Sequence, residues 1–369
     1  MKLNFIKGSN PNWEAIILPA EPNNEEEVKL LEELKNDPVV EKIDHLDGQM
    51  AELIKINHPQ DGLSDDELAP MVKEFFANQP RDKYGCWVYY HWRRQLVRLL
   101  SKEDFVQVRT SRNQYKITKE EQELLSTKKI GVIGLSVGQS VALSLAMERS
   151  FGELRIADFD TLELSNMNRI RTGVYHLGVK KAWMVSREIA EIDPFLKVVI
   201  YEEGITDDNI NEFFESNGGL DLLVEECDSL PVKIKSRIKA KSLKIPVIMD
   251  TSDRGLMDIE RFDDEPQRPI FHGFLEEFGE ENELAEILQE RYKEILMSIL
   301  DFDQLSERLK MSMEQIGKTI TTWPQLASSV IMGGAMGAHY ARMILLNQKV
   351  PSKRFYVDLE EVIGGLDEG

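Results

Sequence analysis

The chain has 369 residues, of which 42% are hydrophobic and 30% are charged, and its formal net charge is −20. This composition excludes a wholly disordered protein, and the length predicts one large α/β domain with smaller appended pieces. Nucleic acid is not expected as a partner, because an electronegative surface repels phosphate backbones.

Cysteine content and hydropathy restrict the class further. Cys86 and Cys227 are the only cysteines, so neither a disulfide framework nor a zinc site of two CxxC pairs is possible. The N-terminal residues reach Ser9, Asn10 and Pro11 before any long apolar run, so no secretory signal is expected. No segment approaches the roughly 20 apolar residues that span a bilayer. We therefore expect a cytoplasmic protein that does not contact a membrane.

Residues 1–105 are expected to form a small, mostly helical domain. Apolar residues recur at helical spacing in the acidic segments 25–34 and 65–76, and prolines interrupt the region. Residues 93–100 (RRQLVRLL) predict a basic amphipathic helix. In so acidic a chain, we expect this helix to pack on the following domain rather than to contact nucleic acid.

Residues 106–369 are expected to form a Rossmann-like α/β domain with a doubly wound, mainly parallel sheet. Short apolar or β-branched runs alternate with helical patterns, which is typical of βαβ units. Right-handed crossovers place the ligand at the carboxyl ends of the strands, so functional residues should directly follow strands. The expected strands lie at residues 130–134, 154–158, 198–201, 222–224 and 246–250.

The last third of the chain predicts an insertion into this domain. Residues 276–310 are acidic and helical in pattern, and a long helix over residues 325–346 and a strand over residues 354–358 follow. We expect substrate choice to reside in this insertion and in the N-terminal domain.

A glycine-containing turn follows the first of these strands and opens a helix. Backbone N–H groups at such a helix start bind phosphate, which makes Gly134, Ser136 and Gly138 candidate cofactor-binding residues. A strict GxGxxG pattern would have glycine in place of Ser136 and of Gln139. Taken alone, the turn therefore fits a purely structural strand-to-helix connection as well as it fits a nucleotide site.

Two aspartates stand at the end of the next strand. Asp158 lies near the offset of about 20 residues from the glycine turn at which a carboxylate accepts ribose hydroxyls. Asp160 is a second candidate cofactor-binding residue. The structural alternative, an N-cap of the next segment, fits Asp160 about as well as Asp158.

Polar and cationic side chains, among them Asn166 and Arg169, follow this strand directly. Hydride transfer does not require such groups. Attack of a carboxylate on the α-phosphate of ATP requires them, because negative charge accumulates on the phosphate oxygens and on the departing pyrophosphate. Arginine, lysine and metal ions stabilise that charge. The run therefore favours ATP over NAD.

The order and spacing of these motifs resemble the ThiF/MoeB/HesA superfamily, adenylating enzymes akin to ubiquitin-activating enzymes. The resemblance covers residues 109–262, and the last helix and strand also follow in family order. The matching segments are residues 158–160 (DFD), 165–169 (SNMNR), 178–182 (GVKKA), 193–194 (DP) and 227–228 (CD).

This resemblance implies ATP and Mg²⁺ as cofactors. It implies that Asp158 binds ribose, that Asn166, Arg169 and Lys181 contact the phosphates, and that Asp228 holds Mg²⁺. Of these, Arg169, Lys181 and Asp228 are the expected catalytic residues.

Three assignments have alternatives. Lys180 is the neighbour that rivals Lys181, and Asp228 could instead cap the helix after its strand. Arg112 resembles the family's arginine that reaches a neighbouring subunit's ATP, which makes it a candidate catalytic residue and implies a homodimer. Its alternative is an exposed linker arginine, and the sequence leaves open whether it acts in cis or in trans.

The expected function is ATP- and Mg²⁺-dependent adenylation of a carboxylate with release of pyrophosphate. The resemblance implies the C-terminal carboxylate of a ubiquitin-like or sulfur-carrier protein or of a peptide as substrate, with Arg254 and Gly255 lining its channel. Cys227 stands at a strand end, where a small buried residue is expected rather than a nucleophile, so the adenylate passes to an external acceptor.

Two other functions stay open at this point. One is a nucleotide-binding scaffold subunit with reduced catalysis, and the other, less favoured, is an NAD-dependent oxidoreductase. The chain is also compatible with being the activating part of a larger fusion.

Overall fold

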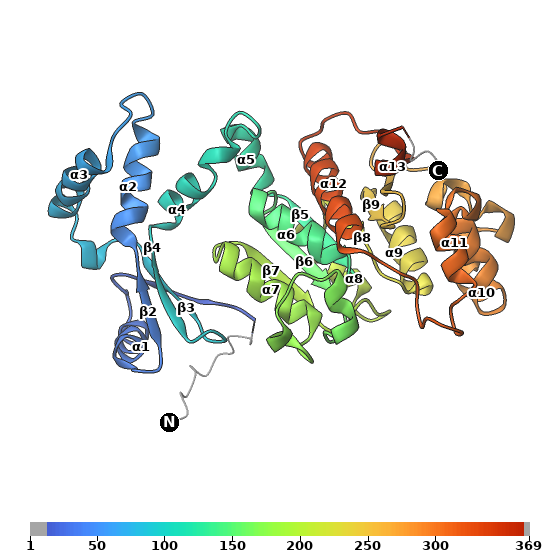
Figure 1. Cartoon of the computed structure of the whole chain (residues 1–369), viewed down its shortest axis with the longest axis horizontal. Coiled ribbons are helices and arrows are strands. Elements are labelled where there is room, and N and C mark those ends of the chain that lie inside the picture. Colours follow the sequence, from blue (N-terminus) through green and yellow to red (C-terminus); the bar gives the residue numbers. More distant parts are fainter. Residues whose placement is uncertain (1–12, 365–369) are drawn as a thin grey trace. The chain divides into compact units, whose positions relative to one another are not determined.

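The computed structural model describes residues 13–364, and Figure 1 draws the course of the chain. Its residues divide into two compact units. The first comprises Met1–Glu120 with Ser186–Leu196, and the second comprises Glu121–Val185 with Lys197–Gly369. The expected domain boundary between residues 105 and 106 stays a prediction.

The first unit contains a four-stranded mixed sheet in the order β1-β3-β4-β2. In this sheet β3 pairs antiparallel with β1 and β4, whereas β2 pairs parallel with β4. The strands are β1 (Ile16–Pro19), β2 (Glu41–Asp44), β3 (Cys86–Tyr90) and β4 (Gln95–Leu99), and the helices are α1 (Glu25–Asn36), α2 (Leu46–Asn57), α3 (Asp65–Asn78) and α4 (Lys102–Arg109).

The expectation of a mostly helical N-terminal domain was therefore wrong. Residues 93–100 form a turn and the strand β4, in which half-buried and buried side chains alternate with the period of a strand. The sequence pattern misled because Arg98 was counted as part of an exposed basic face. Arg98 is only 2% exposed, and its guanidinium donates to the backbone carbonyls of Arg81 and Tyr84 and lies over the Trp87 ring.

The second unit contains a seven-stranded sheet in the order β11-β10-β9-β8-β5-β6-β7. The five strands β5 to β9 pair in parallel, and β10 pairs antiparallel with both of its neighbours, β9 and β11. This confirms the expected mainly parallel α/β sheet. The strands are β5 (Lys129–Ile133), β6 (Glu153–Ala157), β7 (Lys197–Tyr201), β8 (Leu222–Glu225), β9 (Val247–Asp250), β10 (Leu256–Glu260) and β11 (Lys353–Tyr356).

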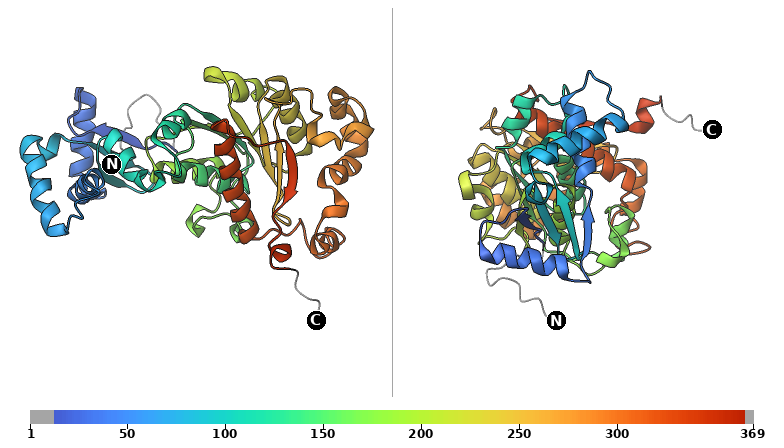
Figure 2. Two further views of the ribbon diagram at one scale, coloured as in Figure 1. Left: turned by 90° about the horizontal axis from the view of Figure 1, so that it is seen from above. Right: turned by 90° about the vertical axis from the view of Figure 1, so that its left-hand side faces the viewer.

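Helices cover this sheet on both sides, with α12 on one side and α10 on the other (Figure 2). On the first side, α12 packs against α6 and the strands β8 to β10. On the other side, α9 packs against β8, and α10 packs against α9. The helices of this unit are α6 (Gly138–Glu148), α8 (Ile210–Glu215), α9 (Leu230–Ser242), α10 (Leu284–Leu300), α11 (Glu307–Met313), α12 (Ala327–Leu345) and α13 (Leu359–Val362), and the residues of α5 (Lys119–Leu125) and α7 (Lys181–Ile192) are divided between the two units. The helical insertion and the long C-terminal helix are thus confirmed.

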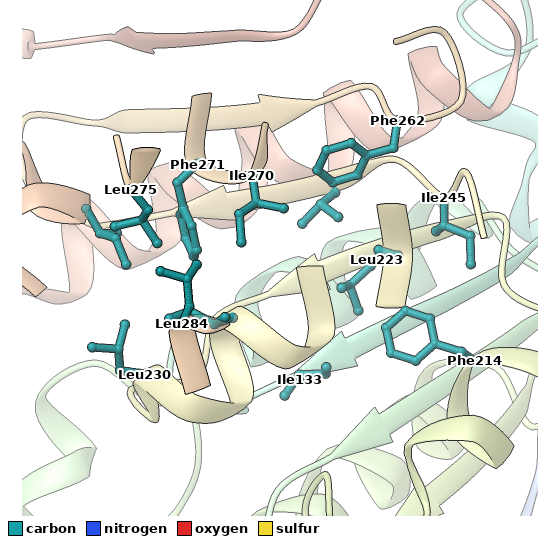
Figure 3. Close-up of a cluster of buried hydrophobic side chains, with 14 of the residues drawn as sticks. Ile133, Phe214, Leu223, Leu230, Ile245, Phe262, Ile270, Phe271, Leu275 and Leu284 are labelled. Atoms are coloured by element: carbon teal, nitrogen blue, oxygen red, sulfur yellow. The ribbon is translucent and has the colours of Figure 1, made fainter. Parts of the chain in front are cut away.

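Buried apolar side chains join the sheet, α9 and the insertion into one core (Figure 3). Ile133 on β5 and Leu223 on β8 belong to it, together with Leu230 at the start of α9 and Phe271 in the connection after β10. Leu284, the first residue of α10, is also fully buried in this cluster. The insertion is therefore packed onto the α/β domain.

The strand β10 was not among the expected strands, and Arg254 and Gly255, which precede it, were expected to line the channel for the substrate. The chain turns back through Ser252 and Arg254, which have positive φ angles of 58° and 51°, and β10 then pairs antiparallel with β9. The Arg254 guanidinium donates from Nε to Asp358 Oδ2 at 2.7 Å and from Nη1 to the Gln304 carbonyl oxygen at 2.8 Å. Arg254 therefore fastens the turn to α13 and to the insertion.

Across residues 13–364, none of the helices combines the length and the apolar character that crossing a membrane requires.

Candidate functional site

A cavity of about 120 Å³ opens at the carboxyl ends of β5, β6 and β8. The strand order reverses here, because β5 has β6 on one side and β8 on the other. Ligands of open α/β sheets bind at such points. The cavity is lined by residues 133–136, 157–160, 204–205, 226–229 and 232.

The glycine turn after β5 packs closely on the end of β8. Gly134 has a φ of 85°, and a Cβ atom there would lie 2.7 Å from backbone atoms of Glu226 and Cys227. A Cβ atom on Gly138, the first residue of α6, would lie 2.7 Å from a methyl group of Val132. Both glycines are required by the packing of the chain on itself, and Ser136 between them lines the cavity.

The Asp158 carboxylate ties the end of β6 to this turn. Its Oδ2 accepts the backbone N–H of Leu135 at 2.7 Å, and its Oδ1 accepts the backbone N–H of Asp160 at 2.8 Å. Burial raises the pKa of Asp158, and the charge of Lys181 opposes that shift. Since a carboxylate oxygen accepts more than one hydrogen bond, Asp158 can also accept a hydroxyl group at the cavity wall.

The Lys181 ammonium connects the start of α7 to the glycine turn and to the segment after β6. Lys181 is the first residue of α7, and its side chain is 4% exposed. Its Nζ lies 2.8 Å from Asp160 Oδ2 and 3.2 Å from Ser136 Oγ. The neighbouring Lys180 instead pairs with Glu202 at 3.3 Å. Of the two lysines, Lys181 is the one whose charge adjoins the cavity lining.

Arg169 and Asp228 interact electrostatically. Burial lowers the pKa of the Arg169 guanidinium, and the negative charge of Asp228 opposes this shift. The Arg169 Nη1 donates to Asn168 Oδ1 at 3.0 Å, whereas its buried Nε has no hydrogen-bond partner among the residues that the structure describes. Asp228 is exposed and lines the cavity. A donor without a partner beside an open carboxylate is an arrangement suited to an anionic ligand with a cation.

Asp228 suits a metal ion only if other ligands complete the coordination. Among residues 13–364 no group of three His, Cys, Asp or Glu side chains could hold a metal ion. Magnesium in proteins is commonly held by one or two carboxylates together with substrate phosphates and water. The donor set at Asp228 therefore fits Mg²⁺ that arrives with a polyphosphate.

Asn166 and Arg112, two further expected site residues, do not line the cavity. Asn166 caps a 3-10 helix, η3 (Leu164–Asn168), because its Oδ1 accepts the backbone N–H of Glu163 at 3.1 Å. Arg112 is exposed in a second 3-10 helix, η2 (Ser111–Asn113), of the first unit. Their expected contacts with phosphate stay predictions.

A buried ion cluster holds the turn that carries Asp228. Glu225 at the end of β8 accepts the backbone N–H of Cys227 at 2.9 Å and the ammonium of Lys233 at 2.8 Å, and it also pairs with Arg237. Burial alone would raise the pKa of Glu225, but Lys233 and Arg237 lower it to about 2. Glu225 is therefore ionised at neutral pH and fixes the start of the turn.

The Cys227 thiol lines the cavity but is not activated. Burial raises the pKa of this thiol well above its ordinary value, and Sγ points to the backbone carbonyl of Ser229 at 3.6 Å. Because the thiolate is the nucleophile, a thiol with a raised pKa is a poor one.

Sequence reasoning missed several side chains that shape the cavity. Phe159, Ile205 and Val232 contribute to its apolar lining, and the Glu226 side chain lies near Gly138, while its carboxyl accepts the backbone N–H of Asp250 at 2.9 Å. Each follows or precedes a predicted strand or helix, so the strand-end rule marks the right segments. It does not say which residues of a segment face inward.

Comparison with known proteins places these features in a family. Residues 110–359 match the model of the ThiF family. The chain is 38% identical over 352 residues to "Uncharacterized protein MT1398" of Mycobacterium tuberculosis (strain CDC 1551 / Oshkosh), an alignment that covers 95% of this chain and 46% of that protein. It is 29% identical over 104 residues to ubiquitin-like modifier-activating enzyme 5 of Xenopus laevis, covering 27% of this chain and 26% of that protein.

Among solved structures, the chain is similar to E. coli tRNA N6-threonylcarbamoyladenosine dehydratase, TcdA, in complex with AMP. The TM-score is 0.45 and the identity 19%, and the match covers 65% of this chain and 95% of that chain. The chain spans less than half the length of the two curated relatives named above. Since the family model matches residues 110–359, well over half of the chain, this protein belongs to the ThiF family.

Proposed function

We propose that this protein binds ATP with Mg²⁺ in the cavity of the second unit and activates a carboxylate as its acyl-adenylate. The observation that carries the proposal is the gathering of charge around one small cavity. The Lys181 ammonium lies beside Ser136 and Asp160, which line the cavity, and the Arg169 guanidinium lies within electrostatic reach of Asp228, a third lining residue. Family membership supports it, because ThiF-family proteins are typically ATP-dependent adenylating enzymes.

The reaction is a substitution at the α-phosphorus of ATP. A carboxylate oxygen forms a bond to that phosphorus, the bond to the bridging oxygen of the β-phosphate breaks, and pyrophosphate leaves with the electron pair. Negative charge grows on the phosphate oxygens during this step, so fixed cations that contact them lower its barrier. Arg169 and Lys181 are the cations that this chain supplies.

The remaining residues hold the nucleotide. Asp158 accepts a ribose hydroxyl, the backbone of the turn from Gly134 to Gly138 contacts phosphate, and Asp228 is the protein ligand of the metal. Mg²⁺, when bound, neutralises charge on the pyrophosphate. Phe159 and Val232 contribute apolar surface against which a base can lie.

The substrate that best suits this chemistry is the C-terminal carboxylate of a ubiquitin-like or sulfur-carrier protein or of a peptide. The relative named as a ubiquitin-like modifier-activating enzyme supports this choice. The acyl group then passes to an external thiol, amine or sulfur donor, because the Cys227 thiol is half-buried and its raised pKa keeps it protonated. In this proposal the active form is a homodimer to which Arg112 contributes across the subunit interface.

Calorimetric titration of the full chain tests the choice of nucleotide. ATP should bind in the presence of Mg²⁺ and NADH should not, and Asp228→Asn should remove the dependence of ATP affinity on Mg²⁺. The matched control is Asp207→Asn, since Asp207 is an exposed aspartate that pairs only with Lys235 among the ion pairs of the described residues. Binding of NADH without binding of ATP would overturn the proposal.

A further inference from the structure

Gln139, one of the two residues that depart from the strict glycine pattern, makes two hydrogen bonds to the backbone of Arg171. Its side chain lies on the first turn of α6 and is 2% exposed. The Nε2 donates to the backbone carbonyl of Arg171 at 3.1 Å, and the Oε1 accepts the backbone N–H of the same residue at 3.1 Å. One amide thus satisfies both backbone groups of one residue, and the reversed amide orientation would oppose donor to donor.

This contact anchors the loop that carries Arg169. The loop connects the end of β6 to the start of α7, and an antiparallel bridge between Thr161 and Lys180 joins its two ends. Within the loop, Arg171 is held by Gln139, two residues away from Arg169. Without the Gln139 side chain, the loop would lose these two hydrogen bonds to α6.

A second amide orients the guanidinium itself. Asn168 Oδ1 accepts from Arg169 Nη1 at 3.0 Å, and Asn168 Nδ2 donates to the backbone carbonyl of Gln325 at 2.6 Å. Arg169 therefore lies between two anchored residues, Asn168 and Arg171. Its buried Nε remains without a partner among the described residues, as a donor held ready for a ligand would.

We propose that Gln139 is a positioning residue that holds Arg169 at the height of the bound nucleotide's phosphates. The inference rests on the proposed function, and it assigns to the side chain at position 139 a task that glycine in the strict pattern cannot perform. Ordering a loop before the ligand arrives removes the entropy that binding would otherwise lose, so affinity for phosphate groups increases. The gain applies to ligands that reach Arg169 and to no others.

That restriction defines the experiment, which compares ATP with adenosine. Gln139→Met keeps the length of the side chain and removes both hydrogen bonds. We expect its affinity for ATP with Mg²⁺ to fall about tenfold or more, while its affinity for adenosine stays within about twofold. Ser144→Ala is the matched control on the same helix, because the Ser144 hydroxyl donates to the Ser140 carbonyl at 2.8 Å, one turn back on α6 itself, and not to the loop. This control should leave both affinities unchanged.

A double-mutant cycle then asks whether Gln139 acts through Arg169. If it does, Gln139→Met should weaken ATP binding little further once Arg169→Ala is present. Independent additive losses would overturn the proposal, as would an equal loss of ATP and adenosine affinity or no loss of either.

Hydrogen exchange in the nucleotide-free protein separates this inference from the proposed function. Gln139→Met should speed amide exchange across residues 166–172, and unchanged exchange there would overturn the positioning role whatever the nucleotide data. Absence of ATP binding by the unsubstituted chain would instead overturn the proposed function and, with it, the phosphate role of the loop. ATP binding that survives Gln139→Met unchanged would overturn only the present inference.

Discussion

Lys181 Nζ lies 2.8 Å from Asp160 Oδ2, and the two side chains differ widely in exposure, at 4% for the lysine and 51% for the aspartate. The ammonium group is thus held inside the protein by a carboxylate that faces outward. A charge that is buried must keep a partner, so Lys181 is fixed in place before any ligand binds. A phosphate group that enters the cavity meets a cation already in position.

Replacing this cation should weaken nucleotide binding specifically. Lys181→Met is expected to lower ATP affinity about tenfold or more, because it removes a charge-assisted hydrogen bond to phosphate. Isothermal titration measures the effect. Lys180→Met is the control, since Lys180 pairs with Glu202 and Glu203 rather than with the cavity lining. Equal losses in the two variants would contradict the role assigned to Lys181.

The buried ion cluster beneath the site should contribute strongly to stability. Arg237 is fully buried between Glu225 and Glu260, so Arg237→Ala leaves the buried Glu260 without its ion-pair partner and leaves Glu225 with Lys233 alone. We expect a loss of about 3–5 kcal/mol in the free energy of unfolding, measured by urea denaturation. On the same helix, Lys235 pairs with Asp207 at the surface, and Lys235→Ala should cost at most about 1 kcal/mol. Similar losses of stability in Arg237→Ala and Lys235→Ala would show that the buried ion cluster does not contribute more to stability than a surface ion pair does.

Asp250 at the end of β9 predicts a pH dependence of stability. Burial raises its pKa from 3.8 to about 6. Between these values the folded protein binds a proton that the unfolded chain has released, so the free energy of unfolding falls as pH rises through this window. The shift corresponds to roughly 3 kcal/mol.

The Asp250→Asn variant removes this titration, together with the charge that helps to raise the pKa of the neighbouring Glu226. Asparagine keeps an acceptor for the Ser252 N–H, which Asp250 Oδ1 accepts at 3.1 Å, but it does not titrate. Relative to the variant, the unsubstituted protein should lose stability from pH 4 to pH 6. Denaturation curves at a series of pH values measure the difference, and parallel pH profiles would refute the assignment to Asp250.

Subunit mixing tests whether Arg112 acts in trans. Arg112→Ala and Lys181→Met should each lack adenylating activity as homodimers. In a mixed dimer one site combines an intact Lys181 with the intact Arg112 of the other copy, so a statistical mixture should recover about a quarter of the activity. Pyrophosphate exchange measures the recovery. No recovery after the subunits have been shown to exchange would place Arg112 in cis or outside the site.

The parallel sheet could be predicted from sequence because each of its strands is a short apolar run flanked by helical patterns. The sheet of the first unit could not, because Arg98 is charged yet buried among backbone carbonyls, and a charge at that position imitates the polar face of a helix. The strand β10 was missed since its turn depends on positive φ angles at Ser252 and Arg254, which favour glycine and are not visible in the residue types.

The site was predictable at the level of segments. Strand ends and motif order marked Asp158, Arg169 and Asp228, and the structure brings Arg169 and Asp228 within electrostatic reach of each other. The choice between Lys180 and Lys181 depends on how α7 is rotated, which adjacent identical residues cannot reveal. The contact of Gln139 with Arg171 joins distant positions, and the sequence pattern presented it only as a missing glycine.

Pyrophosphate exchange into ATP tests the central claim most directly. The full chain is incubated with ATP, Mg²⁺, labelled pyrophosphate and a panel of small carrier proteins and peptides, each offered with a free C-terminal carboxylate and with that carboxylate amidated. Carboxylate activation predicts that label enters ATP only with a free carboxylate and that Lys181→Met abolishes the exchange. Label that enters ATP equally with the amidated partners, or never enters it although ATP binds, would contradict the claim.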